Sequence, residues 1–192
     1  MSLDDPYVYP GTHVLRNHFG ITDPEKLDRI ERRLATQRIA EGVPTGHFDL
    51  DHLKTIHRYL FQDVYDWAGE VRTVEINKGG SQFQFCRFIE TGMADIYRRL
   101  EAADYLQGLS REDFTTQAGQ IIGDVNYVHP FREGNGRTQL QYLKQLAGQA
   151  GHEIDLTRFD PARWLEASRD AHQGRYGRMA MEILKALCPA SL

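Results

Sequence analysis

Residues 125–146, VNYVHPFREGNGRTQLQYLKQL, connect two helical patterns through a short polar segment. The pattern before it begins at Ser110, with Asp113 three residues later in a capping-box arrangement, and apolar residues then recur at helical spacing as far as Val125. The pattern after it continues through Leu143 and Ala147. This stretch therefore predicts two helices joined by a loop that both helices hold in place.

The loop between these helices carries residue types suited to phosphate chemistry. A Gly-Asn-Gly turn at 134–136 that runs into a helix offers free backbone N–H groups at the positive end of the helix dipole, a geometry that binds phosphates. Glu133 would repel phosphate oxygens unless a hard cation such as Mg²⁺ lay between them. Arg137 is suited to contact phosphates, and His129 to accept a proton from a hydroxyl. Each residue alone is more often structural or solvated, so the prediction depends on all of them in this order.

The rest of the chain is dominated by helical patterns. Residues 23–42 and 49–69 each carry apolar side chains at steps of three to five and end at a glycine. Residues 161–187 supply one or two more helices near the C-terminal end. We therefore expect a mostly α fold.

One segment departs from helical spacing. Residues 71–85, VRTVEINKGGSQFQF, alternate in character and contain Lys78 and Gly79 at the centre of a glycine-rich turn. The segment predicts a β-hairpin. It is either a simple connection or an open strand edge to which an extended peptide adds.

Composition excludes several classes of protein. The chain has 192 residues, of which 41% are hydrophobic, and a formal charge of -4. It therefore suits one domain and lacks the basic field that concentrates nucleic acid. Cys86 and Cys188 form no CxxC pair, and no apolar run approaches the roughly 18 residues of a membrane span. The opening MSLDDPYVYP is unlike a secretory signal. We expect a cytoplasmic protein with no membrane or nucleic-acid partner.

The segment HPFREGNGR, residues 129–137, resembles the defining motif of the Fic family, HPFx[D/E]GNGRxxR. Residues 59–76 with the following KGG are similar to the helix and flap that precede that motif in Fic proteins. The resemblance extends over roughly residues 6–187. It implies a single domain over 1–192: a Fic-type helical bundle with a small β-hairpin flap, a core at about 50–187 and an N-terminal helical extension at 1–49.

The resemblance also implies an activity, because most Fic domains transfer AMP from ATP to a Ser, Thr or Tyr hydroxyl of a target protein with Mg²⁺. Carried over by position, it makes His129 the general base, Glu133 the Mg²⁺ ligand and Phe131 the anchor of the loop in the core. The hairpin at about residues 72–85 would be the flap, which holds the target protein. The implied nucleotide-binding residues are Gly134, Asn135, Gly136 and Arg137 of the motif and Lys78 and Gly79 of the flap.

One position departs from the family motif. Leu140 stands where the family has a second arginine that orients the γ-phosphate. The change either weakens or alters nucleotide use, or Leu140 simply extends the core face of its helix with Leu143 and Ala147. Phosphoryl transfer or another nucleotide therefore stays open as an alternative, although the phosphorylating relatives carry Lys at the position of Gly136. A weakly active peptide-binding module is the other alternative.

Many Fic proteins are inhibited by a helix that carries [S/T]xxxE[G/N], and this chain has no match. In the nearest segment Glu41 follows Thr36 by five residues rather than four. The chain therefore resembles the toxin-like class whose inhibitory helix belongs to a separate small antitoxin, and an inhibitor in trans stays open. The action would take place in the cytoplasm or in a host cytosol.

Overall fold

A computed structural model describes residues 5–189. It is mostly helical, which confirms the expected fold class. The elements are α1 (Pro24–Glu41), α2 (Leu50–Phe61), β1 (Asn77–Lys78), β2 (Ser81–Gln82), α3 (Ile89–Ala102), α4 (Arg111–Val128), α5 (Asn135–Gln149), α6 (Pro161–His172) and α7 (Gly177–Ala186), with short 3-10 turns at Cys86–Phe88, Asp104–Leu106 and Leu156–Arg158.

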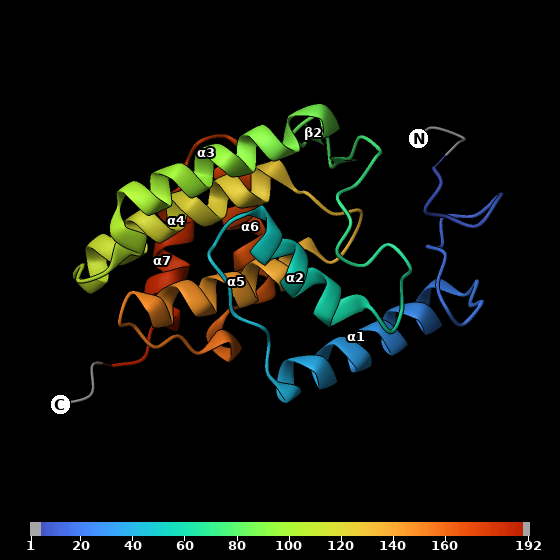
Figure 1. Cartoon of the computed structure of the whole chain (residues 1–192), viewed down its shortest axis with the longest axis horizontal. Coiled ribbons are helices and arrows are strands. Elements are labelled where there is room, and N and C mark those ends of the chain that lie inside the picture. Colours follow the sequence, from blue (N-terminus) through green and yellow to red (C-terminus); the bar gives the residue numbers. More distant parts are fainter. Residues whose placement is uncertain (1–4, 190–192) are drawn as a thin grey trace.

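Helix α4 is the centre of the bundle. It packs against α3, α5, α6 and α7, and its residues Phe114, Ile122 and Val125 are fully buried. Helix α2 packs on α5 and α3 and also on α1, which lies at the opposite edge of the molecule from α3 (Figure 1). No helix within the described residues is both long and apolar enough to cross a membrane.

The caps of α4 and α5 define the loop between them. Ser110 begins α4, its hydroxyl oxygen accepting the Asp113 N–H at 3.1 Å, as the capping pattern predicts. The helix ends at His129, whose φ of 49° is left-handed, and α5 begins after Gly134, with φ of 81°. We call residues 129–134 the motif loop.

Two helical predictions need correction. The helix expected over 49–69 ends at Phe61, although Val64, Tyr65 and Ala68 continue the apolar pattern and are buried. These residues fill the core from a series of turns, because helical spacing and turn spacing can bury the same side chains. The helix at Ile89–Ala102 was not singled out from the sequence. The region 161–187 forms two helices, α6 and α7.

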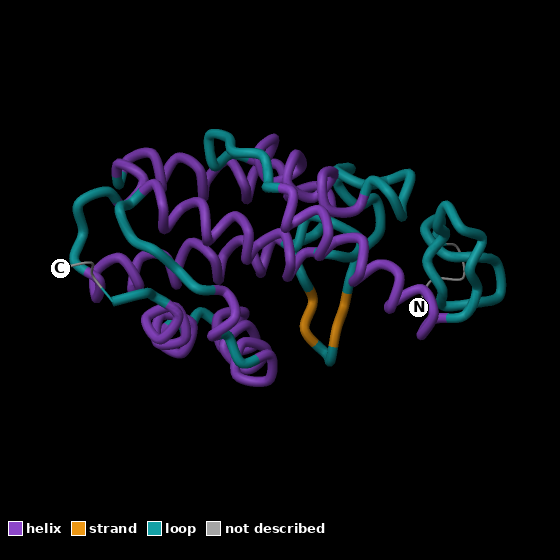
Figure 2. Tube along the Cα trace, turned by 90° about the horizontal axis from the view of Figure 1, so that it is seen from below, coloured by secondary structure: helices purple, strands orange, loops and turns teal. Residues whose placement is uncertain are grey.

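The predicted hairpin is present but much shorter than residues 71–85. Only Asn77–Lys78 pairs with Ser81–Gln82, around Gly79 and Gly80 with φ of 60° and 82°. Positive φ at both central residues is typical of the type I′ turn that suits a two-residue hairpin loop. Figure 2 shows the hairpin projecting from the helical body. The alternation at 71–76 does not form a strand, because Arg72 turns inward and is 2% exposed.

Within the described part of the N-terminal extension, residues 5–49, the helix is α1. Before it, residues 5–23 form turns with one isolated bridge, Val8 to Leu15. The Asp5 carboxylate accepts hydrogen bonds from Arg132 at 2.8 and 2.9 Å, and Tyr7 Oη accepts the Thr73 N–H at 3.1 Å. This segment therefore braces the motif loop and the chain that leads to the flap.

Candidate active site

Two fully buried rings, those of Phe131 and His57, attach the motif loop to the core. Phe131 stacks on His57 with ring centroids 3.9 Å apart. His57 Nδ1 accepts the Gly69 N–H at 2.8 Å, so its Nε2 carries the proton and donates to the Glu133 carbonyl at 2.9 Å. Burial lowers the pKa of His57 to about 3, which keeps the ring neutral. The two rings fix the loop from inside the core.

The Asn135 side chain completes this scaffold, which corrects one expectation. Its Oδ1 accepts the Phe131 N–H at 3.0 Å, and its Nδ2 donates to the Phe131 carbonyl at 2.7 Å. The side chain is 3% exposed. Both of its polar atoms are therefore used inside the loop, and only the backbone N–H of Asn135 is left for a phosphate cradle.

His129 has the protonation pattern of a base. Its Nδ1 donates to the Asn126 carbonyl at 3.2 Å, so the lone pair is on Nε2, which is buried and has no partner within residues 5–189. Burial, with a smaller effect of Lys78, lowers the pKa of His129 to about 3. Phe83 of the flap stacks on the imidazole with centroids 3.8 Å apart. The imidazole of His129 is therefore neutral, oriented by the Asn126 carbonyl and covered on one face by Phe83.

Glu133 faces the flap. One carboxylate oxygen accepts the Gly134 N–H at 3.0 Å, and the other lies 3.6 Å from Lys78 Nζ. Burial raises the pKa of this carboxyl, but Lys78, the Gly134 N–H and Arg137 outweigh it and hold the pKa below its usual value. Glu133 is therefore an anion in which one oxygen is engaged only by a half-exposed lysine.

The N-terminus of α5 opens beside Glu133. No side chain of the described residues caps the helix, and the N–H groups of its first three residues have no hydrogen-bond partner there. A Cβ at Gly134 would lie 2.5 Å from the Phe61 ring, whereas nothing lies within 4 Å of the Cβ position of Gly136. Three donors are therefore unpaired among the described residues, and the helix end is open at Gly136, as a phosphate site requires.

Arg137 is held by groups that the sequence did not suggest. It pairs with Glu31 of α1 and lies over the Phe61 ring, 4.6 Å from its centroid. Glu31 is 5% exposed and also accepts the Tyr65 hydroxyl. Arg137 Nη1 is buried without a partner among the described residues. The guanidinium is therefore oriented by α1 and keeps one nitrogen free.

The structure brings most predicted site residues to one end of the bundle. Lys78 contacts Glu133, and charges at both positions act on His129. Arg137 lies in the first turn of α5, four residues after Glu133. Gly79 lies in the hairpin turn next to Lys78, and no backbone hydrogen bond among residues 5–189 joins it to the motif loop.

Leu140 differs from its neighbours on α5. Leu143 and Ala147 are fully buried, but Leu140 is only partly buried. It follows Arg137 by three residues, so the two side chains lie on neighbouring parts of the helix surface. The interpretation of Leu140 as a plain extension of the core face is therefore weakened.

Two residues missed by sequence reasoning had a detectable signal. Glu31 lies with Leu27 and Ala35 at steps of four, so it is a lone carboxylate on the buried stripe of α1. His57 lies with Leu53 and Phe61 in the same way on α2. A polar residue on a core stripe indicates a buried polar contact.

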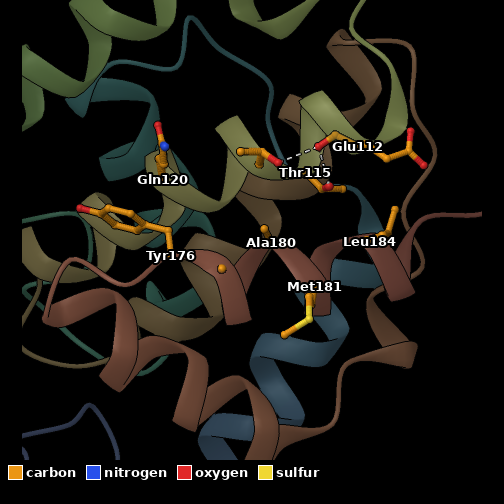
Figure 3. A pocket seen from close by; sticks show the side chains of 9 residues that line it. Glu112, Thr115, Gln120, Tyr176, Ala180, Met181 and Leu184 are labelled. Atoms are coloured by element: carbon orange, nitrogen blue, oxygen red, sulfur yellow. Dashed lines mark hydrogen bonds between the residues drawn. The ribbon is translucent and has the colours of Figure 1, made fainter.

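A separate hollow of about 460 Å³ lies between α4 and α7 (Figure 3). Its lining includes Thr115, Tyr176 and Met181 and no residue of the motif loop. It is therefore distinct from the candidate active site.

The comparison with protein families agrees with this geometry. Residues 47–147 match the model of the Fic/DOC family, and the chain belongs to that family.

Individual relatives extend the similarity to almost the whole chain. A probable protein adenylyltransferase, y4lH of Sinorhizobium fredii, is 39% identical over 187 residues, covering 97% of each chain. The protein adenylyltransferase VbhT of Bartonella schoenbuchensis is 41% identical over 96% of this chain, which spans 39% of that relative. Among solved structures, BepC of Bartonella tribocorum with bound AMPPNP superposes with a TM-score of 0.90 at 25% identity, covering all of both chains.

Proposed function

We propose that this protein transfers AMP from ATP to a hydroxyl group of a target protein. The observation that carries the proposal is the pairing of a neutral imidazole, His129, whose lone pair is fixed on Nε2, with three free N–H donors at the start of α5. One feature serves a hydroxyl and the other serves phosphates. The names of y4lH and VbhT support the same reaction.

His129 supplies the base. Its Nε2 takes the proton of the target hydroxyl as the oxygen attacks the α-phosphorus of ATP. A phosphodiester bond forms, the bond from the α-phosphorus to the bridging oxygen breaks, and pyrophosphate leaves with that electron pair. Because Nε2 is buried in this structure, the hydroxyl reaches it only after the flap or Phe83 shifts.

The phosphates lie against the N-terminus of α5, where the free N–H groups and the helix dipole bind negative charge. Arg137, with one nitrogen unpaired, donates to an oxygen of the leaving pyrophosphate. Lys78 approaches from the flap.

The residues present fit a bound Mg²⁺. Glu133 is an anionic oxygen donor, and the part of the chain that the structure describes holds no cluster of three acidic, His or Cys side chains that would bind a metal by itself. One carboxylate with substrate phosphates is the arrangement that Mg²⁺ favours. When bound, Mg²⁺ would neutralise charge on the phosphates, and Glu133 would hold it in place of the contact with Lys78.

The target is proposed to lie along the flap, where the edge of the short hairpin offers backbone groups for strand pairing. An inhibitory antitoxin in trans belongs to the same proposal and rests on the family resemblance alone. Action in the cytoplasm or a host cytosol is also part of the proposal, and it rests on the composition of the chain together with the resemblance.

A peptide-binding module without transfer is the second candidate. The observation that favours it is the cover over His129, since Phe83 occupies one face of the ring. A module of this kind would bind a target segment on the flap with the base permanently shielded.

Two labels separate the candidates. The protein is incubated with a cell lysate, MgCl₂ and ATP labelled at either the α- or the γ-phosphate. We expect protein-bound label from α-labelled ATP only. Label from γ-labelled ATP only would replace the proposal by phosphoryl transfer. If neither form of ATP labels a protein, transfer is refuted and the peptide-binding module is the candidate that fits.

A matched pair of variants tests the base. His129→Ala should lower transfer by roughly a hundredfold or more, with ATP affinity nearly unchanged. His152→Ala is the control, because His152 also contacts a backbone carbonyl, that of Leu109, but packs on Phe114 outside the site. An equal loss of ATP affinity and transfer in His129→Ala would contradict the assignment.

A further inference from the structure

Arg72 is a fully buried arginine outside the Fic motif, and it has no part in the chemistry described above. Its guanidinium is surrounded by backbone carbonyls from three parts of the chain: the end of α4 with the motif loop, and the two segments that flank the hairpin. A buried charge is costly unless each donor is paired, so the number of partners here indicates a site with a specific role.

On one side Arg72 binds the end of α4 and the start of the motif loop. Its Nε donates to the His129 carbonyl at 2.7 Å and Nη2 to the Val128 carbonyl at 3.4 Å, while its backbone N–H donates to the Pro130 carbonyl at 2.9 Å. Three successive carbonyls at the negative end of the α4 dipole therefore face this one residue. These three hydrogen bonds from Arg72 stabilise the left-handed conformation of His129.

On the other side Arg72 binds both chains that lead into the flap. Nη1 donates to the Val74 carbonyl at 2.7 Å, and Nη2 donates to the Gln84 carbonyl at 2.5 Å. The Glu75 carboxylate lies 3.6 Å from Nη1. The hairpin is only two residues long on each side. Its base is therefore fixed by these contacts together with two backbone hydrogen bonds, from the Phe83 N–H to the Ile76 carbonyl and from the Gln84 N–H to the Tyr127 carbonyl, each 3.1 Å.

We propose that Arg72 is a positioning residue that sets the distance and angle between the flap and His129. Phe83, which stacks on His129, lies directly before Gln84 and is thereby placed by the same guanidinium. The inference deepens the proposed function and rests on it for its effect on transfer. A target held by the flap meets the base in register because the Arg72 side chain bonds both the flap and the motif loop.

The geometry requires the planar fork of arginine. The guanidinium donates to four carbonyls from three parts of the chain, and its five N–H groups point in fixed directions that reach them. A lysine ammonium keeps the charge but has three donors on one atom. Arg72→Lys therefore keeps the charge and breaks the bridge.

The test compares Arg72→Lys with Arg111→Lys. Arg111 likewise donates to two backbone carbonyls at the end of a helix, those of Leu187 and Cys188 after α7, away from the site. Both variants are checked for folding by circular dichroism. Hydrogen exchange is then followed at the amides of Phe83 and Gln84, together with Mg²⁺-ATP affinity and transfer of label from α-labelled ATP to lysate proteins.

For Arg72→Lys we expect exchange at these two amides to rise by about tenfold or more over Arg111→Lys. Transfer should fall by about tenfold or more, with the KM for ATP within about twofold of wild type, because the phosphate site is not touched. Exchange no faster than in Arg111→Lys would overturn the proposal. So would an unchanged rate of transfer, or a loss of ATP affinity equal to the loss of transfer.

Failure of the proposed function is separable from failure of this inference. If the wild-type protein transfers no label, the exchange measurement alone still decides whether Arg72 fixes the flap. If Arg72→Lys does not fold, the wild-type protein is used, and exchange of the Arg72 Nε–H is compared with exchange of the Phe83 and Gln84 amides. Because one guanidinium bonds both sides, we expect the three protons to be protected to within about threefold of one another. Amides that open about tenfold more often than the Arg72 Nε–H would show that the flap moves while the bridge is intact, and would overturn the proposal.

Discussion

Replacing Leu140 by arginine should strengthen the binding of ATP, but not that of AMP. Position 140 follows Arg137 by three residues on α5, and its side chain is partly exposed. An arginine there reaches toward the distal phosphates that the resemblance places beside Arg137. A charge-assisted hydrogen bond contributes about 1.5–3 kcal/mol, which is about a 10- to 150-fold gain in affinity.

The cost of the same substitution is small. Full burial of a leucine side chain contributes about 1.5–3 kcal/mol, so a partly buried one contributes about half of that. The aliphatic stem of arginine recovers part of this loss by covering the same apolar surface. We expect the melting temperature to fall by no more than about 2–4 °C.

Calorimetric titration with Mg²⁺-ATP and with AMP measures the effect directly, and a thermal melt measures its cost. Leu140→Lys supplies the charge without the fork and should gain less. Leu140→Met keeps the volume without charge and should gain nothing. A folded Leu140→Arg protein with equal gains for ATP and AMP, or with no gain, would refute the placement of position 140 at the distal phosphates.

Three other perturbations test separate parts of the site. Glu133→Gln should weaken ATP binding in MgCl₂ by about tenfold while leaving the affinity in EDTA nearly unchanged; an unchanged Mg²⁺ requirement in a titration would remove the metal assignment. Gly134→Ala should lose about 2 kcal/mol or more in a denaturant melt, because φ of 81° is unfavourable for alanine and its Cβ would meet Phe61. Gly136→Ala, which faces open space, is the control and should be at least as stable as wild type. Finally, the pKa values of His57 and His129 are lowered to about 3, so below pH 6.5 the unfolded chain binds protons that the folded chain does not. Stability should therefore be constant above pH 6.5 and fall on acidification, by about 2 kcal/mol per histidine at pH 5, and His57→Gln should remove about half of that loss in denaturant melts at pH 7 and 5.

The helices around the motif loop could be predicted because their signals are local. Ser110 caps α4 by the hydroxyl contact that its spacing to Asp113 predicts, and the apolar residues of α4 are buried at the expected positions. The end of α2 could not be predicted in this way. Val64 and Tyr65 keep the apolar spacing of the helix but are buried from turns, so the pattern reports burial and not backbone conformation.

The candidate site was predictable for residues within the motif and not for those that support it. His129 and Glu133 are close in sequence to the Gly-Asn-Gly turn that begins α5, so a single motif predicts all of them together. The support comes from distant residues, since Glu31 is 106 positions from Arg137 and Arg72 is 57 positions from His129. The family resemblance implied a nucleotide-binding role for Asn135, but its side-chain amide is used by the Phe131 backbone. Which of two nearby partners a polar side chain takes depends on packing that local spacing does not encode.

The contact between Asp5 and Arg132 has a consequence for how the chain acquires its structure. The two residues are 127 positions apart, so the motif loop receives this brace only when both ends of a long stretch of polypeptide have come together. Closing so large a loop costs conformational entropy. During synthesis on a ribosome, Asp5 has no Arg132 to bind until most of the chain has been made. A recombinant fragment cut to residues 47–147 would contain every motif residue, and yet it would lack Asp5, Tyr7 and the α1 carboxylate that orients Arg137. Such a fragment would keep the contacts of His57, Arg72 and Asn135 but lose every contact that the N-terminal segment makes with the site.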